Sequence, residues 1–128
     1  MDNISIEATE RSPKIELDFG KNVYSLSGES YPEDVTAFFG PIMEKLESHF
    51  EGLEGADILF NFELIYFNSS SAKIIMGLFD MLEEVAEEGN KVNITWTFEE
   101  DDDNMEELGE EFGEDLEAAK FKMKAVKV

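Results

Sequence analysis

Three consecutive serines follow an asparagine, and their hydroxyls are the groups of this chain best suited to reversible chemistry. The run is Asn68-Ser69-Ser70-Ser71, between a strongly apolar segment and one in which apolar residues have helical spacing. Free backbone N–H groups and the positive end of the dipole make a helix start favourable for phosphate. Ordinary helix capping accounts for only one Asn or Ser in such a run. The run therefore predicts a phosphorylation site.

Helical phase separates the three serines. With residues placed 100° apart, the core side of the following helix is defined by Ile74, Ile75, Leu78, Leu82 and Val85. Ser71 falls on that inward side, whereas Ser69 projects nearly opposite, close to the direction of Met76. We therefore predict Ser69 as the phosphate acceptor, Ser70 as the alternative acceptor and Ser71 as a structural residue.

A partner-binding surface is predicted around the same serines. Met76, with Phe79 at its fringe, gives an otherwise polar helix face an apolar spot, and flexible methionine suits partner binding. A core-filling role for Phe79 is equally compatible with its position. The residues expected to bind the partner are Asn68, Ser69, Ser70, Met76 and Phe79.

The remaining reactive side chains do not suggest an enzyme, a metal site or a cofactor. His49 is the only histidine, and no nucleophile or orienting group is evident beside it. An EF-hand loop starting at Asp101 would need Gly and Glu where the chain has Glu106 and Phe112. We expect the carboxylates of residues 99–117, and the Glu83-Glu84 pair, to be solvated on helix faces. The absence of cysteine excludes thiolate zinc sites and thiol nucleophiles.

Composition indicates one globular domain, residues 1–128, with 42% hydrophobic residues and a formal net charge of -21. Such a charge repels phosphate backbones and anionic lipids, so we expect no nucleic-acid and no membrane partner. No apolar stretch approaches the 18 residues of a membrane span, and the N-terminus lacks the pattern of a signal peptide. A cytoplasmic location is the resulting expectation.

The elements that would position these groups alternate in type after an initial run of strands. Ser30 and Glu33 have capping-box spacing before the first helix, and Gly40-Pro41 predicts a kink or two short helices. The segment from Ala56 to Phe67 is nearly continuous in apolar residues, which favours a central strand covered on both faces. The expected strands are 4–9, 14–19, 23–28, 56–67, 91–98 and 119–128, and the later helices are 72–88 and 101–116.

This order predicts an α/β sandwich in which three main helices pack on a mixed sheet of about five to six strands. Asp103 and Glu106 have capping-box-like spacing at the start of the third helix. Lysines alternate with apolar residues in the last strand, from Lys120 to Lys124. Lysine on alternate positions is typical of a sheet edge protected against further pairing.

The sequence resembles the SiaC family of bacterial phosphoregulated signalling proteins. The similarity spans most of the chain, and its Tyr-Pro-Glu and Asn-Ser-Ser-Ser elements occur in the family's order. The segments that carry it are Ser30-Tyr31-Pro32-Glu33, Leu64-Ile65-Tyr66-Phe67-Asn68-Ser69-Ser70-Ser71, Leu78-Phe79-Asp80-Met81-Leu82-Glu83 and Glu110-Glu111-Phe112-Gly113-Glu114-Asp115. The resemblance implies a STAS-like fold, similar to that of anti-sigma-factor antagonists.

The resemblance also implies a partner-switching circuit. A histidine-kinase-like Ser/Thr kinase would phosphorylate the family's Asn-Thr-Ser-Ser motif on its threonine, and a PP2C-type phosphatase would reverse the reaction. The position of that threonine is Ser69 here. The unphosphorylated form would bind and activate a diguanylate cyclase, which raises cyclic di-GMP and promotes biofilm. The alternative is an anti-sigma-factor-antagonist-type STAS module that regulates transcription through an anti-sigma kinase.

Overall fold

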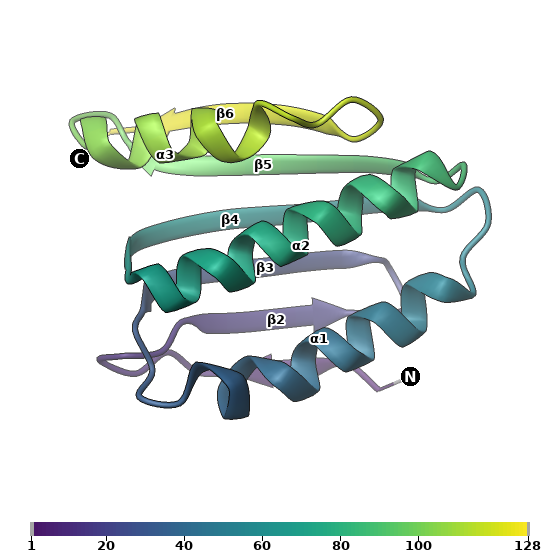
Figure 1. The fold of residues 1–128 in the computed structure, drawn as a ribbon, viewed down its shortest axis with the longest axis horizontal. Coiled ribbons are helices and arrows are strands. Elements are labelled where there is room, and N and C mark those ends of the chain that lie inside the picture. The colour runs from purple at the N-terminus through teal and green to yellow at the C-terminus, as the bar shows by residue number, and fades with distance from the viewer. Residues whose placement is uncertain (1, 128) are drawn as a thin grey trace.

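A single six-stranded β-sheet with three α-helices accounts for the regular structure of the computed structural model, which describes residues 2–127 (Figure 1). The strands are β1 (Ile4–Ile6), β2 (Lys14–Asp18), β3 (Val23–Ser30), β4 (Asp57–Phe67), β5 (Lys91–Glu99) and β6 (Lys120–Val126). The helices are α1 (Val35–Glu51), α2 (Ser69–Glu87) and α3 (Asp103–Gly113). The predicted α/β class, with a mixed sheet and three main helices, is confirmed.

Strand order in the sheet equals strand order in the chain. β1, β2 and β3 pair antiparallel, and β3, β4, β5 and β6 pair parallel. Each parallel connection therefore crosses through one helix to the adjacent strand, always in the same direction. Since such crossovers are right-handed, all three helices must lie on the same face of the sheet, as Figure 1 shows. The result is a two-layer sandwich.

The core fills the space between this helical layer and the sheet. Its centre is aromatic: Phe62 stacks on Phe60 with ring centroids 4.6 Å apart, and Trp96 lies 5.8 Å from Phe62. Each of these rings is at most 2% exposed. Burying one large apolar side chain contributes roughly 2–3 kcal/mol, so this aromatic centre holds β4 and β5 firmly against the helices.

β4 is covered on one face only, and the prediction that it is covered on both is wrong. Phe60 and Phe62 face the helices, whereas Leu59 and Ile65 are 42% and 59% exposed on the opposite face. The reason is the topology described above, which places every helix on one side. Apolar residues on the open face concealed the alternation that would have indicated this.

Two helix starts also differ from the expectation. α1 is capped by Asp34, whose carboxylate accepts the N–H of Ala37 at 3.0 Å, and Ser30 instead ends β3. α1 then continues as one helix through Pro41, so the alternative of two short helices is wrong. Asp102, rather than Asp103, caps α3. The lysine-bearing β6 lies at a sheet edge, as predicted.

None of the helices within residues 2–127 combines the length and the apolar character needed to cross a membrane.

Candidate functional site

The predicted phosphorylation run forms the first turn of α2. Asn68 has an extended backbone and is the N-cap: its side-chain oxygen accepts the N–H of Ser71 at 2.9 Å. Its backbone carbonyl accepts the N–H of Ala72, also at 2.9 Å. The asparagine thus supplies acceptors for N–H groups that lack an intrahelical partner. Because of this cap, α2 begins at Ser69, three residues before the predicted start at residue 72.

The structure separates the serines as helical phase predicted. The side chains of Ser69 and Ser70 are exposed at the first two helical positions. Ser71 is 0% exposed, and its hydroxyl accepts a 2.8 Å hydrogen bond from the equally buried hydroxyl of Ser30. The N–H of Asn68 donates to the carbonyl of Ser30 at 3.2 Å. Ser71 is therefore structural, which confirms its predicted role.

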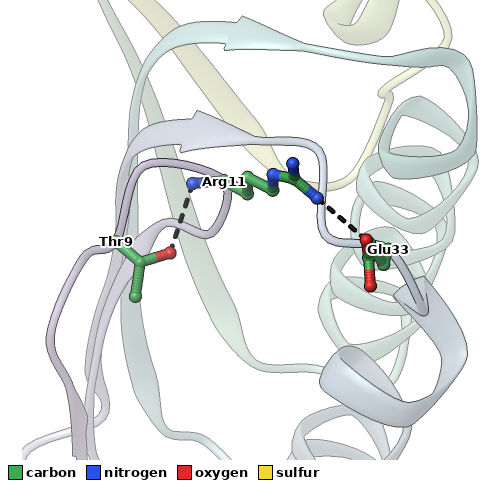
Figure 2. Close-up of polar contacts among 3 residues, drawn as sticks. All are labelled: Thr9, Arg11 and Glu33. Atoms are coloured by element: carbon green, nitrogen blue, oxygen red, sulfur yellow. Dashed lines mark hydrogen bonds and ion pairs between the residues drawn. The ribbon is translucent and has the colours of Figure 1, made fainter.

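The segments beside this turn come from the N-terminal third of the chain. The ring of Tyr31 packs edge-on against Tyr66 at 5.7 Å, and the N–H of Tyr31 donates to the carbonyl of Arg11 at 2.6 Å. Figure 2 shows Arg11, the only arginine, extended between Thr9 and Glu33. The backbone N–H of Arg11 donates to the Thr9 hydroxyl at 3.2 Å, and its guanidinium donates to the Glu33 carboxylate at 3.0 Å. These contacts tie the β1–β2 loop to the connection between β3 and α1.

Met76 lies on the same exposed stripe of α2 as Ser69. The two residues are seven positions apart, which places them on one face at a separation of about 10 Å along the axis. Met76 is 53% exposed, and Lys73, the only basic residue of α2, lies between them. Beyond Met76, a shallow pocket of about 110 Å³ opens between α2 and α3. An apolar side chain with free surface therefore lies two turns from the exposed serines.

Phe79 does not belong to that exposed spot. It is 3% exposed and packs on Phe62 and Phe112, with ring centroids 5.0 and 5.6 Å away. The prediction that Phe79 adds to an exposed apolar spot is wrong, and the core-filling alternative holds. The reason is α3, which crosses beside α2 and covers this ring; the helical period of α2 alone does not show that neighbour.

His49 lies at the far end of the molecule from Ser69. Its Nε2 is 2.8 Å from the side-chain oxygen of Asn22, before β3, and its ring packs edge-on against Phe19 at 5.0 Å. Burial lowers the pKa of His49 below its ordinary value. Ser69 follows the carboxyl end of β4, whereas Asn22 precedes β3, which is parallel to β4, so Ser69 and His49 lie at opposite ends of the sheet. The serine and the histidine therefore do not form a nucleophile–base pair.

Glu83 has a structural function that the sequence did not reveal. Its carboxylate accepts backbone N–H groups from Glu117, Ala118 and Ala119 at 2.8 to 3.0 Å, which fixes the connection between α3 and β6 on α2. Burial raises the pKa of Glu83, but these three donors outweigh it and hold the pKa below its usual value. The prediction that Glu83 is simply solvated is wrong. Within residues 2–127, no group of three or more His, Asp or Glu side chains is arranged to hold a metal ion.

Comparisons with known proteins agree with this architecture. The chain is 32% identical over 116 residues to an uncharacterized protein of Pseudomonas aeruginosa (strain UCBPP-PA14), an alignment that covers 90% of both. It is similar to the crystal structure of apo-SiaC from Pseudomonas aeruginosa, with a TM-score of 0.82 and 29% identity over 98% of this chain and 100% of that one.

A further similar structure is SiaC from Pseudomonas aeruginosa in complex with the diguanylate cyclase SiaD, of which that SiaC is the activator. The TM-score is 0.87 at 28% identity, over 96% of this chain and 99% of the other. The sequence description of SiaC family regulatory phosphoproteins matches residues 6–126, nearly the whole chain. The chain therefore belongs to the SiaC family of regulatory phosphoproteins.

Proposed function

We propose that this protein is a non-enzymatic binding module whose unphosphorylated form binds and activates a diguanylate cyclase, thereby controlling cyclic di-GMP and biofilm. Family membership supports a regulatory phosphoprotein. The SiaC relative bound to the cyclase SiaD supports this class of partner. The binding surface is the exposed stripe of α2, with Asn68, Ser69, Ser70 and Met76.

The observation that carries the proposal is the exposed Ser69 hydroxyl on the same stripe as Met76. A phosphate on Ser69 adds up to about two negative charges within about 10 Å of Met76. The phosphate is itself favoured at the first turn of α2, because the N-terminal end of the helix dipole is positive and Lys73 carries a positive charge one turn away. A partner that covers Met76 must then desolvate or face that charge. Phosphorylation thus weakens binding without disturbing the fold.

The enzymes of the cycle are part of the proposal. A histidine-kinase-like Ser/Thr kinase adds the phosphate and a PP2C-type phosphatase removes it. Serine in place of the family's threonine retains the hydroxyl, and Ser70 is the reserve acceptor. Ser71 is excluded because its side chain is fully buried.

The acceptor is tested with the cognate kinase, ATP and mass spectrometry of the intact protein and its peptides. We expect one phosphate on wild type, one on Ser70→Ala and none on Ser69→Ala. The Ser70→Ala variant is the matched control, since it removes the neighbouring exposed hydroxyl of the same turn. If Ser69→Ala is phosphorylated as fully as wild type, Ser69 is not the phosphate acceptor, and the mapped peptide shows whether Ser70 is.

The gate is tested by titrating the cyclase with Ser69→Asp and Ser69→Asn, which have side chains of nearly equal size. We expect Asp to weaken binding about ten-fold relative to Asn, because only Asp adds charge at the interface. Cyclase activity should fall in parallel. Equal affinities would contradict the electrostatic gate. Binding to an anti-sigma kinase, with none to the cyclase, would instead support the transcriptional alternative.

A further inference from the structure

A groove of about 280 Å³ lies between the C-terminal halves of α1 and α2. Its floor is apolar: Met81 of α2 is half-buried there, and Phe50 of α1 and Val85 of α2, which are 2% and 5% exposed, close its base. Gly77 lines the groove at a position where any larger residue would project a side chain into it. A Cβ at this position would be in ordinary contact with one atom of another element, Cε of Met43, at 3.7 Å. The groove is therefore open at Gly77, and the apolar surface that it offers comes chiefly from Met81.

The rims of this groove are uniformly acidic. No basic residue lines the groove. Its rims carry five exposed carboxylates, which are Glu47, Glu51, Asp80, Glu84 and Glu88. The ion pairs among the described residues are Arg11–Glu33 and Lys14–Glu16, so none of the five carboxylates has a cationic partner there. α1 and α2 run in the same direction, so both contribute their C-terminal, negative dipole ends to this region (Figure 1).

We propose that this groove is a docking site for a basic amphipathic helix of a protein partner. An apolar side chain of that helix would lie on the floor between Phe50 and Met81. Lysine or arginine residues on either side of it would face the carboxylates of the two rims. The proposed occupant follows from charge complementarity together with the apolar floor, since a small inorganic cation or a polyamine would make no use of that floor.

This surface is distinct from the Ser69 stripe. The residues of α2 that line the groove are 8 to 19 positions after Ser69, which corresponds to about 12 to 28 Å along the helix axis. Gly77, Met81 and Val85 line the groove beside α1, whereas the shallow pocket beyond Met76 lies beside α3, and Asp80 lines both. Ser69 itself lines neither the groove nor that pocket, so a partner helix confined to the groove leaves Ser69 accessible to its kinase.

The proposal is tested with a labelled synthetic helical peptide of about 18 residues, with leucines along one face and lysines on both flanks. Its control is a scrambled peptide of identical composition that has lost the leucine stripe. We expect fluorescence anisotropy at 50 mM salt to show at least ten-fold tighter binding of the amphipathic peptide. Equal binding of both peptides would show attraction of charge only, and would overturn the docking site.

Variants then locate the binding. Glu47→Gln/Glu84→Gln removes one charge from each rim, whereas Glu107→Gln/Glu110→Gln removes two exposed charges from α3. We expect the rim variant to bind the peptide about five-fold more weakly, and the α3 variant to change affinity by less than two-fold. Equal effects of the two would overturn the groove as the site. Ser69→Asp should leave peptide binding unchanged, so failure of this proposal is distinguishable from failure of the phosphorylation gate.

Discussion

The hydroxyl of Ser30, at the end of β3, donates a 2.8 Å hydrogen bond to the hydroxyl of Ser71, in the first turn of α2, and both side chains are fully buried. This bond joins residues 41 positions apart and connects the start of α2 to the end of β3. The exposed Ser69 is two residues away. The orientation of the proposed phosphate acceptor therefore depends on a neighbour that can never be modified in the folded protein.

We expect Ser30→Ala and Ser71→Ala each to lower the free energy of unfolding by about 1–3 kcal/mol, because each leaves the other hydroxyl buried with its partner removed. The double variant should lose less than the sum of the two, since it leaves no orphaned group. Urea unfolding of the four proteins measures this cycle. Strict additivity would show that the two hydroxyls contribute independently.

Asn68 should be replaceable by aspartate but not by alanine. Asn68→Ala removes the acceptor for the N–H of Ser71 and should cost about 1 kcal/mol in unfolding free energy. Asn68→Asp keeps an acceptor of the same geometry, so its stability should stay within about 0.5 kcal/mol of wild type. Thermal unfolding followed by circular dichroism distinguishes the two. Identical losses in both variants would contradict the capping assignment.

Met76→Ala should weaken cyclase binding while leaving the fold intact. Its side chain is 53% exposed, so truncation should change the unfolding free energy by less than about 0.5 kcal/mol. Loss of an apolar contact at an interface should reduce affinity about ten-fold, as measured by calorimetry. Leu59→Ala, on the open face of the sheet and 42% exposed, is the matched control and should bind normally. A larger effect at Leu59 would place the interface on the sheet.

The contribution of Glu83 should depend on pH. Its folded pKa lies below the ordinary value of 4.5, so ionised Glu83 stabilises the fold above about pH 4.5 and this gain is lost as pH falls through the lowered pKa. We expect Glu83→Gln to be less stable than wild type at pH 7, with the difference shrinking towards pH 3. Glu84→Gln, which removes an exposed carboxylate at the next position, is the matched control. A difference for Glu83→Gln that is constant with pH would contradict the role of the charge.

Replacing glycine by alanine should have opposite effects on stability in α2 and in α3. At Gly109 an added Cβ would overlap Cδ1 of Trp96, so Gly109→Ala should destabilise the protein by about 2 kcal/mol or more. At Gly77 the added Cβ makes only an ordinary contact, so Gly77→Ala should stabilise by up to about 1 kcal/mol through helix propensity. Melting temperatures test both. Similar shifts for the two variants would contradict the close packing of α3 on Trp96.

Local periodicity predicted the features that depend on neighbours in sequence. The helical phase that separated Ser69 from Ser71 needs only the apolar residues of α2, and the structure confirms it. Alternation likewise predicted β2, whose Ile15 and Leu17 are buried as expected. Capping was less reliable, because several polar residues near a helix start can serve: Asp34 caps α1 in place of the expected Ser30.

Features that depend on distant partners could not be predicted. The acceptor of the Ser30 hydroxyl is 41 residues away, and the N–H donors to Glu83 are 34 to 36 residues away. Neither leaves a local pattern. Phe79 is similar: its own helix places it at the edge of the core, and only the position of α3 decides that it is buried. The candidate acceptor was thus predictable, whereas the contacts that orient its helix were not.

Because strand order in the sheet is also the order of synthesis, the domain can be assembled from its N-terminus by successive addition of one helix and one strand. Each new strand pairs with the edge that the previous one left open, and no early strand waits for a late partner inside the sheet. β6 is the final addition, and it replaces the bare edge of β5, next to Trp96, with one that carries alternate lysines. β6 thereby converts an edge open to aggregation into a protected one, and a chain without this strand would leave β5 open to pairing with other chains.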